Sequence, residues 1–97
     1  MANLRKAARD RHCMVRVPGH CSGNPETVVL AHYRMAGLCG TGIKPTDLAA
    51  AWSCSSCHDA IDFRTRTEWS REELRMFHLE GVMRTLAQLE KEGIIKT

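Results

Sequence analysis

The stretch that most constrains this chain is Cys54-Ser55-Ser56-Cys57-His58-Asp59-Ala60-Ile61-Asp62. Two cysteines separated by two residues can hold one zinc ion from a tight turn, because both sulfurs reach the same metal. The segment is expected to continue as a helix, on which His58 and Asp62 project from one face four residues apart. One side of it can therefore ligate a structural metal, while the other presents an imidazole and a carboxylate to a second metal.

The length of 97 residues predicts a single domain covering residues 1–97. The core of so small a domain is modest, so a bound metal would contribute heavily to its stability. No apolar run approaches the ~20 residues needed to span a bilayer. The basic N-terminus lacks the apolar core of a signal peptide. We therefore expect a cytoplasmic protein with no membrane partner.

The chain has five cysteines, and their odd number, the CxxC pair and the lack of an export signal favour zinc over disulfides. We assign four of them to one structural Zn²⁺: Cys13, Cys21, Cys54 and Cys57. Cys39 is the alternative to Cys13 or Cys21, and His12 and His20 are neighbouring substitutes. Thiolate is the softer and more favoured ligand, which supports the four cysteines.

Two segments have the character of strands. Residues 13–17 alternate in polarity and stop at the turn-forming pair Pro18-Gly19. Residues 27–33 form the most β-prone run of the chain, with His32 near its end. We predict that these two segments pair in a small sheet, which the zinc site ties to the helix after the CxxC pair.

Helices are expected at the N-terminus and around the glycine-rich loop. Residues 3–11 are good helix formers after a capping asparagine. Residues 36–46 carry three glycines and a proline, which predicts a loop. Thr46 or Asp47 is then expected to cap a short helical turn over residues 48–52.

The clearest helix is predicted from Ser70 to about Glu92. Ser70 and Glu73 form a capping box, and Gly93 is a natural residue to end the helix. Its apolar stripe is most simply one wall of the core, although it could also serve a homodimer: Leu74, Phe77, Leu79, Val82, Met83, Leu86 and Leu89. His78 lies among these residues and is expected to be a surface or core histidine rather than a ligand.

A group of residues suited to phosphodiester hydrolysis remains once the zinc ligands are assigned. This reaction needs an activated water and a cation near the phosphate. His32 can be the base, with Asp47 accepting its second N–H, because imidazole titrates near neutral pH. His58 and Asp62 can hold the catalytic cation, which would be Mg²⁺, Mn²⁺ or a second Zn²⁺. Asp59 is the nearest competitor for Asp62, but it points roughly 100° away from His58 on a helix.

The positive charge predicts where a nucleic acid would bind. The net charge of +3 is mild. Residues 1–66 hold nine Lys and Arg against five Asp and Glu, whereas residues 67–97 hold five against six. The basic part is the expected DNA-binding face. Within it, Arg34 and Lys44 are placed to grip flanking phosphates, and Arg9 belongs to a basic N-terminal arm.

The order of these groups resembles the HNH, or ββα-metal, endonucleases, whose base histidine ends a strand and whose metal-binding histidine follows a CxxC pair at the start of a helix. Along nearly its full length the chain also resembles the small nucleases of the YbcO type encoded by lambdoid prophages. The matching stretches are Leu4-Arg5-Lys6-Ala7-Ala8-Arg9, Gly23-Asn24-Pro25-Glu26-Thr27, Leu30-Ala31-His32, Gly37-Leu38-Cys39-Gly40-Thr41-Gly42, Cys57-His58-Asp59 and Glu92-Gly93.

The resemblance implies a small α+β, zinc-stabilised ββα-metal (HNH-like) domain with an additional long C-terminal helix. It also implies a metal-dependent DNA endonuclease that acts in recombination with phage or host proteins. The chain departs from the HNH pattern in three places. Ala31 stands where a metal ligand usually precedes the base, Asp47 is the nearest polar residue to the middle Asn, and Asp62 takes the place of the last ligand, which is often His.

Two other functions compete with the endonuclease. The first is a non-catalytic zinc module that binds DNA or a recombination or replication protein, an interpretation that Ala31 favours. The second is a thiol redox switch built on Cys54 and Cys57, which leaves His32 and Asp62 without a role.

Overall fold

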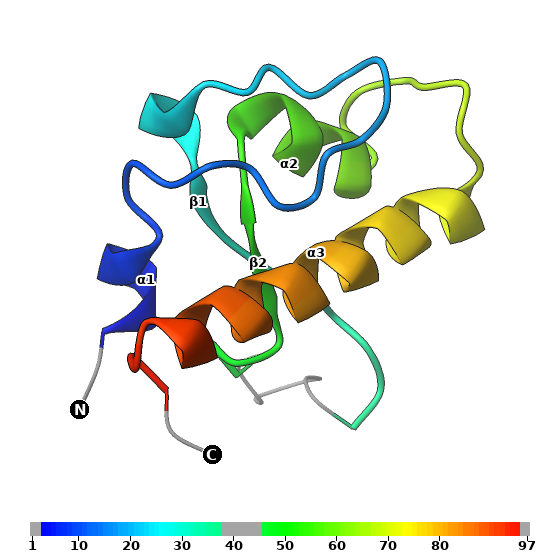
Figure 1. The fold of residues 1–97 in the computed structure, drawn as a ribbon. Helices are drawn as coiled ribbons and strands as arrows, with labels where there is room; N and C mark the ends of the chain where they lie inside the picture. Colours follow the sequence, from blue (N-terminus) through cyan, green and yellow to red (C-terminus); the bar gives the residue numbers. More distant parts are fainter. Residues whose placement is uncertain (1–2, 38–45, 96–97) are drawn as a thin grey trace.

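The computed structural model describes residues 3–37 and 46–95 of the chain (Figure 1). Its elements are, in chain order, α1 (Leu4–Ala7), the short 3₁₀ turn η1 (Pro25–Thr27), β1 (Val29–His32), β2 (Ala50–Ser53), α2 (Ser55–Ile61) and α3 (Arg71–Lys91).

β1 and β2 form an antiparallel pair in which Leu30 lies opposite Trp52 and His32 lies opposite Ala50. All four residues of β2 are buried, and α3 packs across this strand (Figure 1). A two-stranded sheet is marginally stable by itself, so the helix supplies the apolar cover that it needs. α2 starts directly after β2, which gives the order strand, strand, helix and a small α+β fold.

The prediction of a strand over residues 13–17 is wrong, because this segment is irregular. The segment makes a ladder-like bond from the Met14 N–H to the Trp52 carbonyl at 2.7 Å, but Arg16 then adopts a positive φ of 55°, which ends any extended conformation. Val15 and Val17 are nevertheless buried in the core. The alternation of apolar residues therefore predicted correctly that Val15 and Val17 are buried, but predicted incorrectly that the segment pairs with a strand.

The helical turn predicted over residues 48–52 is also wrong, because this region supplies β2. Thr46 does cap a turn, since its hydroxyl oxygen accepts the Leu48 N–H at 3.2 Å. The chain then extends and pairs with β1. Ala50 and Ala51 are buried in the strand that α3 crosses, so tertiary packing overrides the helix propensity of alanine.

The other helices agree with expectation, with shorter bounds. Asn3 caps α1 by accepting the Lys6 N–H, but α1 ends well before residue 11. Ser70 and Glu73 form both bonds of the capping box at the start of α3. Only part of the apolar stripe is buried, because Leu79 and Met83 are exposed.

α3 approaches the segment around Val15 very closely. A Cβ atom added at Gly81 would lie 3.0 Å from the Cα and Cγ2 atoms of Val15. The glycine therefore permits the contact that holds the irregular segment against the helix. Among the described residues, no helix combines the length and the apolar character needed to cross a membrane.

Candidate functional site

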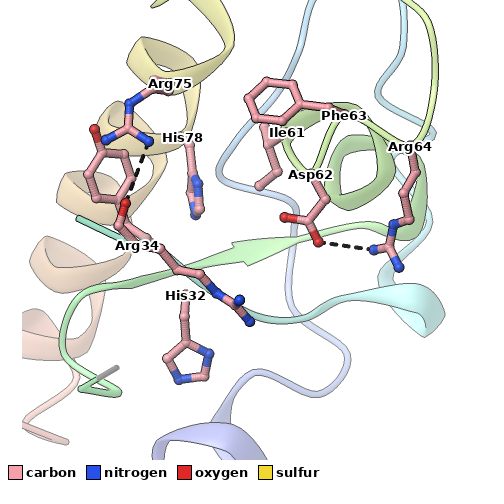
Figure 2. Close-up of a pocket in the computed structure, with 9 residues that line it drawn as sticks. His32, Arg34, Ile61, Asp62, Phe63, Arg64, Arg75 and His78 are labelled. Carbon is pink, nitrogen blue, oxygen red and sulfur yellow. Dashed lines mark hydrogen bonds and ion pairs between the residues drawn. The ribbon is translucent and has the colours of Figure 1, made fainter. Parts of the chain in front are cut away.

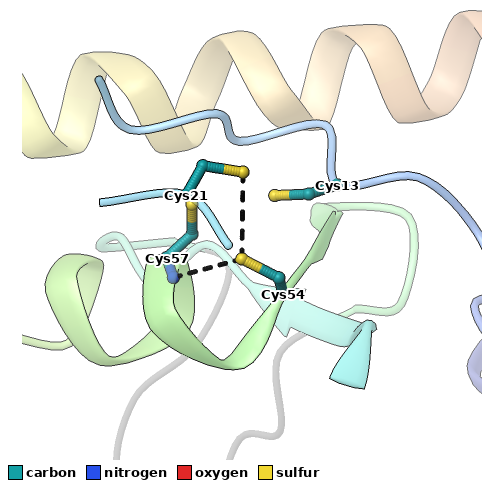
Figure 3. A group of neighbouring side chains, drawn as sticks. All are labelled: Cys13, Cys21, Cys54 and Cys57. Carbon is teal, nitrogen blue, oxygen red and sulfur yellow. Dashed lines mark hydrogen bonds between the residues drawn. The ribbon is translucent and has the colours of Figure 1, made fainter. Parts of the chain in front are cut away.

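Four cysteines meet where the irregular N-terminal segment passes α2 (Figure 3). One ligand atom from each lies within 4.8 Å of the others: Cys13, Cys21, Cys54 and Cys57. Zn–S bonds of about 2.3 Å in a tetrahedron place the sulfurs about 3.8 Å apart. The Cys21 and Cys54 sulfurs are 3.9 Å apart. The cluster can therefore hold a metal ion such as zinc.

The local fold prepares these sulfurs for negative charge. Cys54 is the N-cap of α2 and accepts the Cys57 N–H, and the Cys57 sulfur accepts the Val17 N–H, each at 3.4 Å. A hydrogen bond between the Cys13 and Cys57 side chains lowers the pKa of Cys13 and raises the pKa of Cys57. The Cys13 thiol therefore loses its proton more readily than the Cys57 thiol, and a bound metal would require both to be deprotonated.

The alternative ligands lie elsewhere or outside the described residues. His20 pairs with Glu68 at 3.0 Å instead of joining the cluster. His12 is exposed and lines a separate hollow beside Trp52. Cys39 and Lys44 both lie outside the described residues.

His32 ends β1 and has the partner that the sequence predicts. Its Nε2 atom lies 2.7 Å from Oδ1 of Asp47, which also meets Arg5 at 3.6 Å. The hydrogen bond from His32 is the main cause that lowers the pKa of Asp47. An ionised carboxylate only accepts, so Nε2 carries the proton in this contact and Nδ1 has the lone pair. That nitrogen can act as a base.

His58 and Asp62 meet across one turn at the end of α2. Nε2 of His58 lies 3.2 Å from Oδ2 of Asp62. Adjacent ligands of an octahedral Mg²⁺ ion are about 2.9 Å apart, so the pair could share one cation. Arg64 donates to the same Asp62 oxygen at 3.1 Å and lies 3.3 Å from Asp59. A cation bound to Asp62 would therefore be close to the Arg64 guanidinium.

A cavity of about 360 Å³ connects the two groups, because His32 and Asp62 both line it (Figure 2). His58 does not itself line the cavity but contacts Asp62, which does. In this view Arg34 extends between His32 and Asp62. The structure thus brings together three of the residues proposed for catalysis.

His78 forms the buried wall of this cavity. It is 7% exposed, and its Nε2 donates to the Ala31 carbonyl at 2.9 Å. Burial lowers the pKa of His78, so the ring is neutral. It packs edge-on against Tyr33. This agrees with the expectation of a core histidine, and it anchors the strand one residue before His32.

The arginines around the cavity differ from those expected. Arg34, which is expected to grip a phosphate, lines the cavity, whereas Arg9 is exposed beyond α1 and lines none of the hollows described here. Arg64 and Arg75 also line it and were not singled out from the sequence. The two arginines in Arg64-Thr65-Arg66 were the only sequence signal for positive charge at this place. Arg75 could be assigned to the cavity only after the structure had placed α3 beside it.

The fold and these side chains define a small α+β protein with a cluster of four cysteines that could hold a metal ion and a cavity lined by a histidine and an aspartate. The chain belongs to the family described as "Putative nuclease YbcO", whose model matches residues 2–94.

Two relatives and one solved structure resemble the chain over nearly its full length. It is 57% identical over 99 residues to "Putative nuclease YbcO" of Escherichia coli (strain K12), with 99% of each chain covered. The same values hold for "Putative nuclease ybcO" of Enterobacteria phage 82. The solved "Structure of a putative bacteriophage protein from Escherichia coli str. K-12 substr. MG1655" matches with a TM-score of 0.79 and 49% identity, covering 94% of this chain and 100% of that one.

Proposed function

We propose that this protein is a metal-dependent, HNH-like DNA endonuclease of phage or prophage origin. The observation that carries the proposal is the shared cavity of His32 and Asp62, with Asp47 bonded to the first and His58 to the second. A base and one cation ligand line the same cavity, and the second cation ligand, His58, contacts the first. These are the groups that phosphodiester hydrolysis requires. The names of the relatives support nuclease activity at the level of the family.

The four-cysteine cluster is proposed to hold a structural Zn²⁺ rather than a catalytic one. Four thiolates complete a tetrahedron and leave no open position for water or substrate. Cys54 and Cys57 are fully buried, which fits a closed site. Zinc there would tie the irregular segment that carries Cys13 to the start of α2. The metal would thereby support the cavity without entering the reaction.

In the proposed mechanism, Nδ1 of His32 takes a proton from the attacking water, while Asp47 holds the ring and stabilises the imidazolium. His58 and Asp62 would hold Mg²⁺, Mn²⁺ or a second Zn²⁺. When bound, this cation would stabilise charge on the phosphate and the leaving oxygen. Arg34 can bind a phosphate oxygen of the scissile region from its place in the cavity.

The setting proposed for this activity is the cytoplasm, during phage recombination, with phage or host recombination proteins as partners. A homodimer is proposed through the exposed part of the apolar stripe, where Leu79 and Met83 lie on α3. Size-exclusion chromatography with light scattering at several concentrations tests the dimer directly.

The decisive experiment is cleavage of plasmid, single-stranded and branched DNA by the zinc-loaded protein with Mg²⁺, Mn²⁺, Zn²⁺ or excess EDTA. We expect metal-dependent cuts that His32→Ala abolishes, with the fold and zinc content of the variant unchanged. His12→Ala is a matched control, because this exposed histidine lies outside the cavity. Full cleavage by His32→Ala would remove His32 from the mechanism.

The alternative function is a non-catalytic zinc module that binds DNA or a recombination or replication protein. It is favoured by Ala31, whose methyl group cannot ligate a metal where HNH enzymes place a ligand. This alternative predicts salt-sensitive DNA binding and no strand breakage with any of the divalent cations. Folded, zinc-loaded protein that cuts none of the three substrates would support it.

A further inference from the structure

A second hollow of about 400 Å³ adjoins the cavity, and the two share Phe63 and Arg64 in their walls. Together they are lined by five arginines, which we call the arginine face: Arg34, Arg64, Arg66, Arg71 and Arg75. Arg64 is held by Asp59 and Asp62. Within residues 3–37 and 46–95, the other four have no carboxylate partner. The face therefore carries positive charge that is available to phosphates.

Phe63 lies between the two hollows, with an exposed side chain and an unfavourable backbone conformation. It is 43% exposed, and its backbone has a positive φ of 61°, a conformation that is unfavourable for a bulky side chain. The Arg71 guanidinium lies 4.2 Å from the centre of its ring. A cation therefore covers part of the aromatic ring, while much of the side chain faces solvent. Packing into the core does not explain why the chain holds an aromatic residue there.

We propose that the arginine face binds an unpaired stretch of DNA, with a base stacked on Phe63 and the flanking phosphates bound by the arginines. Aromatic rings stack on bases of any sequence when those bases are unpaired, whereas duplex DNA keeps its base faces inside the helix. This inference rests on the proposed function for the identity of DNA as the ligand. It deepens that function by naming single-stranded, flapped or branched DNA as the substrate class.

Fluorescence anisotropy with no divalent cation added beyond the zinc already bound to the protein tests this directly. The probes are a labelled single strand of about 12 nucleotides, within the range of single-strand site sizes, and a duplex of the same sequence. The zinc-loaded wild-type protein is expected to prefer the single strand. Phe63→Ala should weaken single-strand binding by about 5- to 150-fold, the range for loss of one base–aromatic stack, and leave duplex binding within about twofold. Phe63→Trp should retain the preference.

Phe63→Gly separates binding from folding. Glycine adopts positive φ readily, so this variant loses the ring while relieving the backbone. We expect an equal or higher melting temperature together with loss of the single-strand preference. Met76→Ala is the matched control, because Met76 is 48% exposed on α3 and lines neither hollow. Arg66→Gln should weaken both probes alike and reduce the salt slope by about one.

Single-strand binding that is unchanged in Phe63→Ala and Phe63→Gly would overturn the inference, as would an equal loss for both probes. The outcome is distinguishable from failure of the nuclease proposal. Phe63-dependent binding of single strands without cleavage in any metal would sustain the binding surface and reject the enzyme. Cleavage that requires His32 but does not depend on Phe63 would support the enzyme and reject the binding surface.

Discussion

Replacing Cys21 by serine isolates the contribution of a bound zinc ion from the contribution of packing. Cys21 is exposed, whereas Cys54 and Cys57 are fully buried. An exposed substitution that touches no metal changes the free energy of unfolding by about 0.5 kcal/mol or less. Structural zinc contributes roughly 10–16 kcal/mol in zinc-finger peptides, or about 3 kcal/mol for each of four ligands. The expected loss of free energy of unfolding is therefore about six times larger if Cys21 is a zinc ligand than if it is not.

Thermal unfolding followed by circular dichroism resolves this difference. For a domain of 97 residues, 1 kcal/mol shifts the melting temperature by about 4–8 °C. Loss of a zinc ligand at Cys21 is thus expected to lower it by about 12–24 °C, against about 2–4 °C without a metal role. Zinc content measured on the same samples should fall below one ion per chain. Cys39→Ser is the matched control and should keep both its zinc and its melting temperature.

A Cys21→Ser variant that retains one zinc ion and melts within about 4 °C of wild type would refute Cys21 as a ligand. Loss of zinc from Cys39→Ser would assign that position to Cys39 instead. Loss from His20→Gln would assign it to His20, after release from Glu68.

Three further predictions follow from particular contacts. Gly81→Ala should lower the free energy of unfolding, measured with urea, by up to about 2 kcal/mol. Overpacking against the facing segment costs about 1–3 kcal/mol and outweighs the gain of about 1 kcal/mol in helix propensity. A higher free energy of unfolding would contradict this prediction. Glu92→Gln should lower the melting temperature, and the size of this decrease should not change with pH between about 7.5 and about 5.5. Hydrogen bonds from Arg11 lower the pKa of Glu92 to about 2, so its contribution is complete above the unfolded pKa of about 4.5 and is lost only as pH falls towards 2. Arg64→Gln should tighten Mn²⁺ binding at Asp62 about fivefold by calorimetry, since it removes roughly 1 kcal/mol of repulsion; unchanged affinity would place the cation elsewhere.

Features that depend on neighbouring residues could be predicted from the sequence. The capping box of Ser70 and Glu73 starts α3 as expected. The CxxC pair leads into α2, where helical periodicity places His58 beside Asp62. The contact of His32 with Asp47 was also predicted, although it spans 15 residues, because a carboxylate commonly orients a functional histidine by accepting its second N–H.

Strand pairing could not be predicted in the same way. The alternation of Val15 and Val17 is the same whether a segment joins a sheet or packs irregularly under a helix. The positive φ of Arg16 and the bond from Val17 to Cys57, 40 residues away, exclude the sheet. β2 took that place, and all four of its residues are buried where α3 packs across the strand, a contact that exists only after the helix has packed.

The residues that could ligate a metal and the points where the helices begin could be read from the chain alone, because caps and helical faces depend on residues about four positions apart. The assembly of the cavity could not be read in this way. His78 reaches Ala31 across 47 residues, and Arg75 and Phe63 join Arg34 from other elements. These neighbours are set by the packing of α3 on the sheet, which depends on the whole core and leaves no local pattern in the chain.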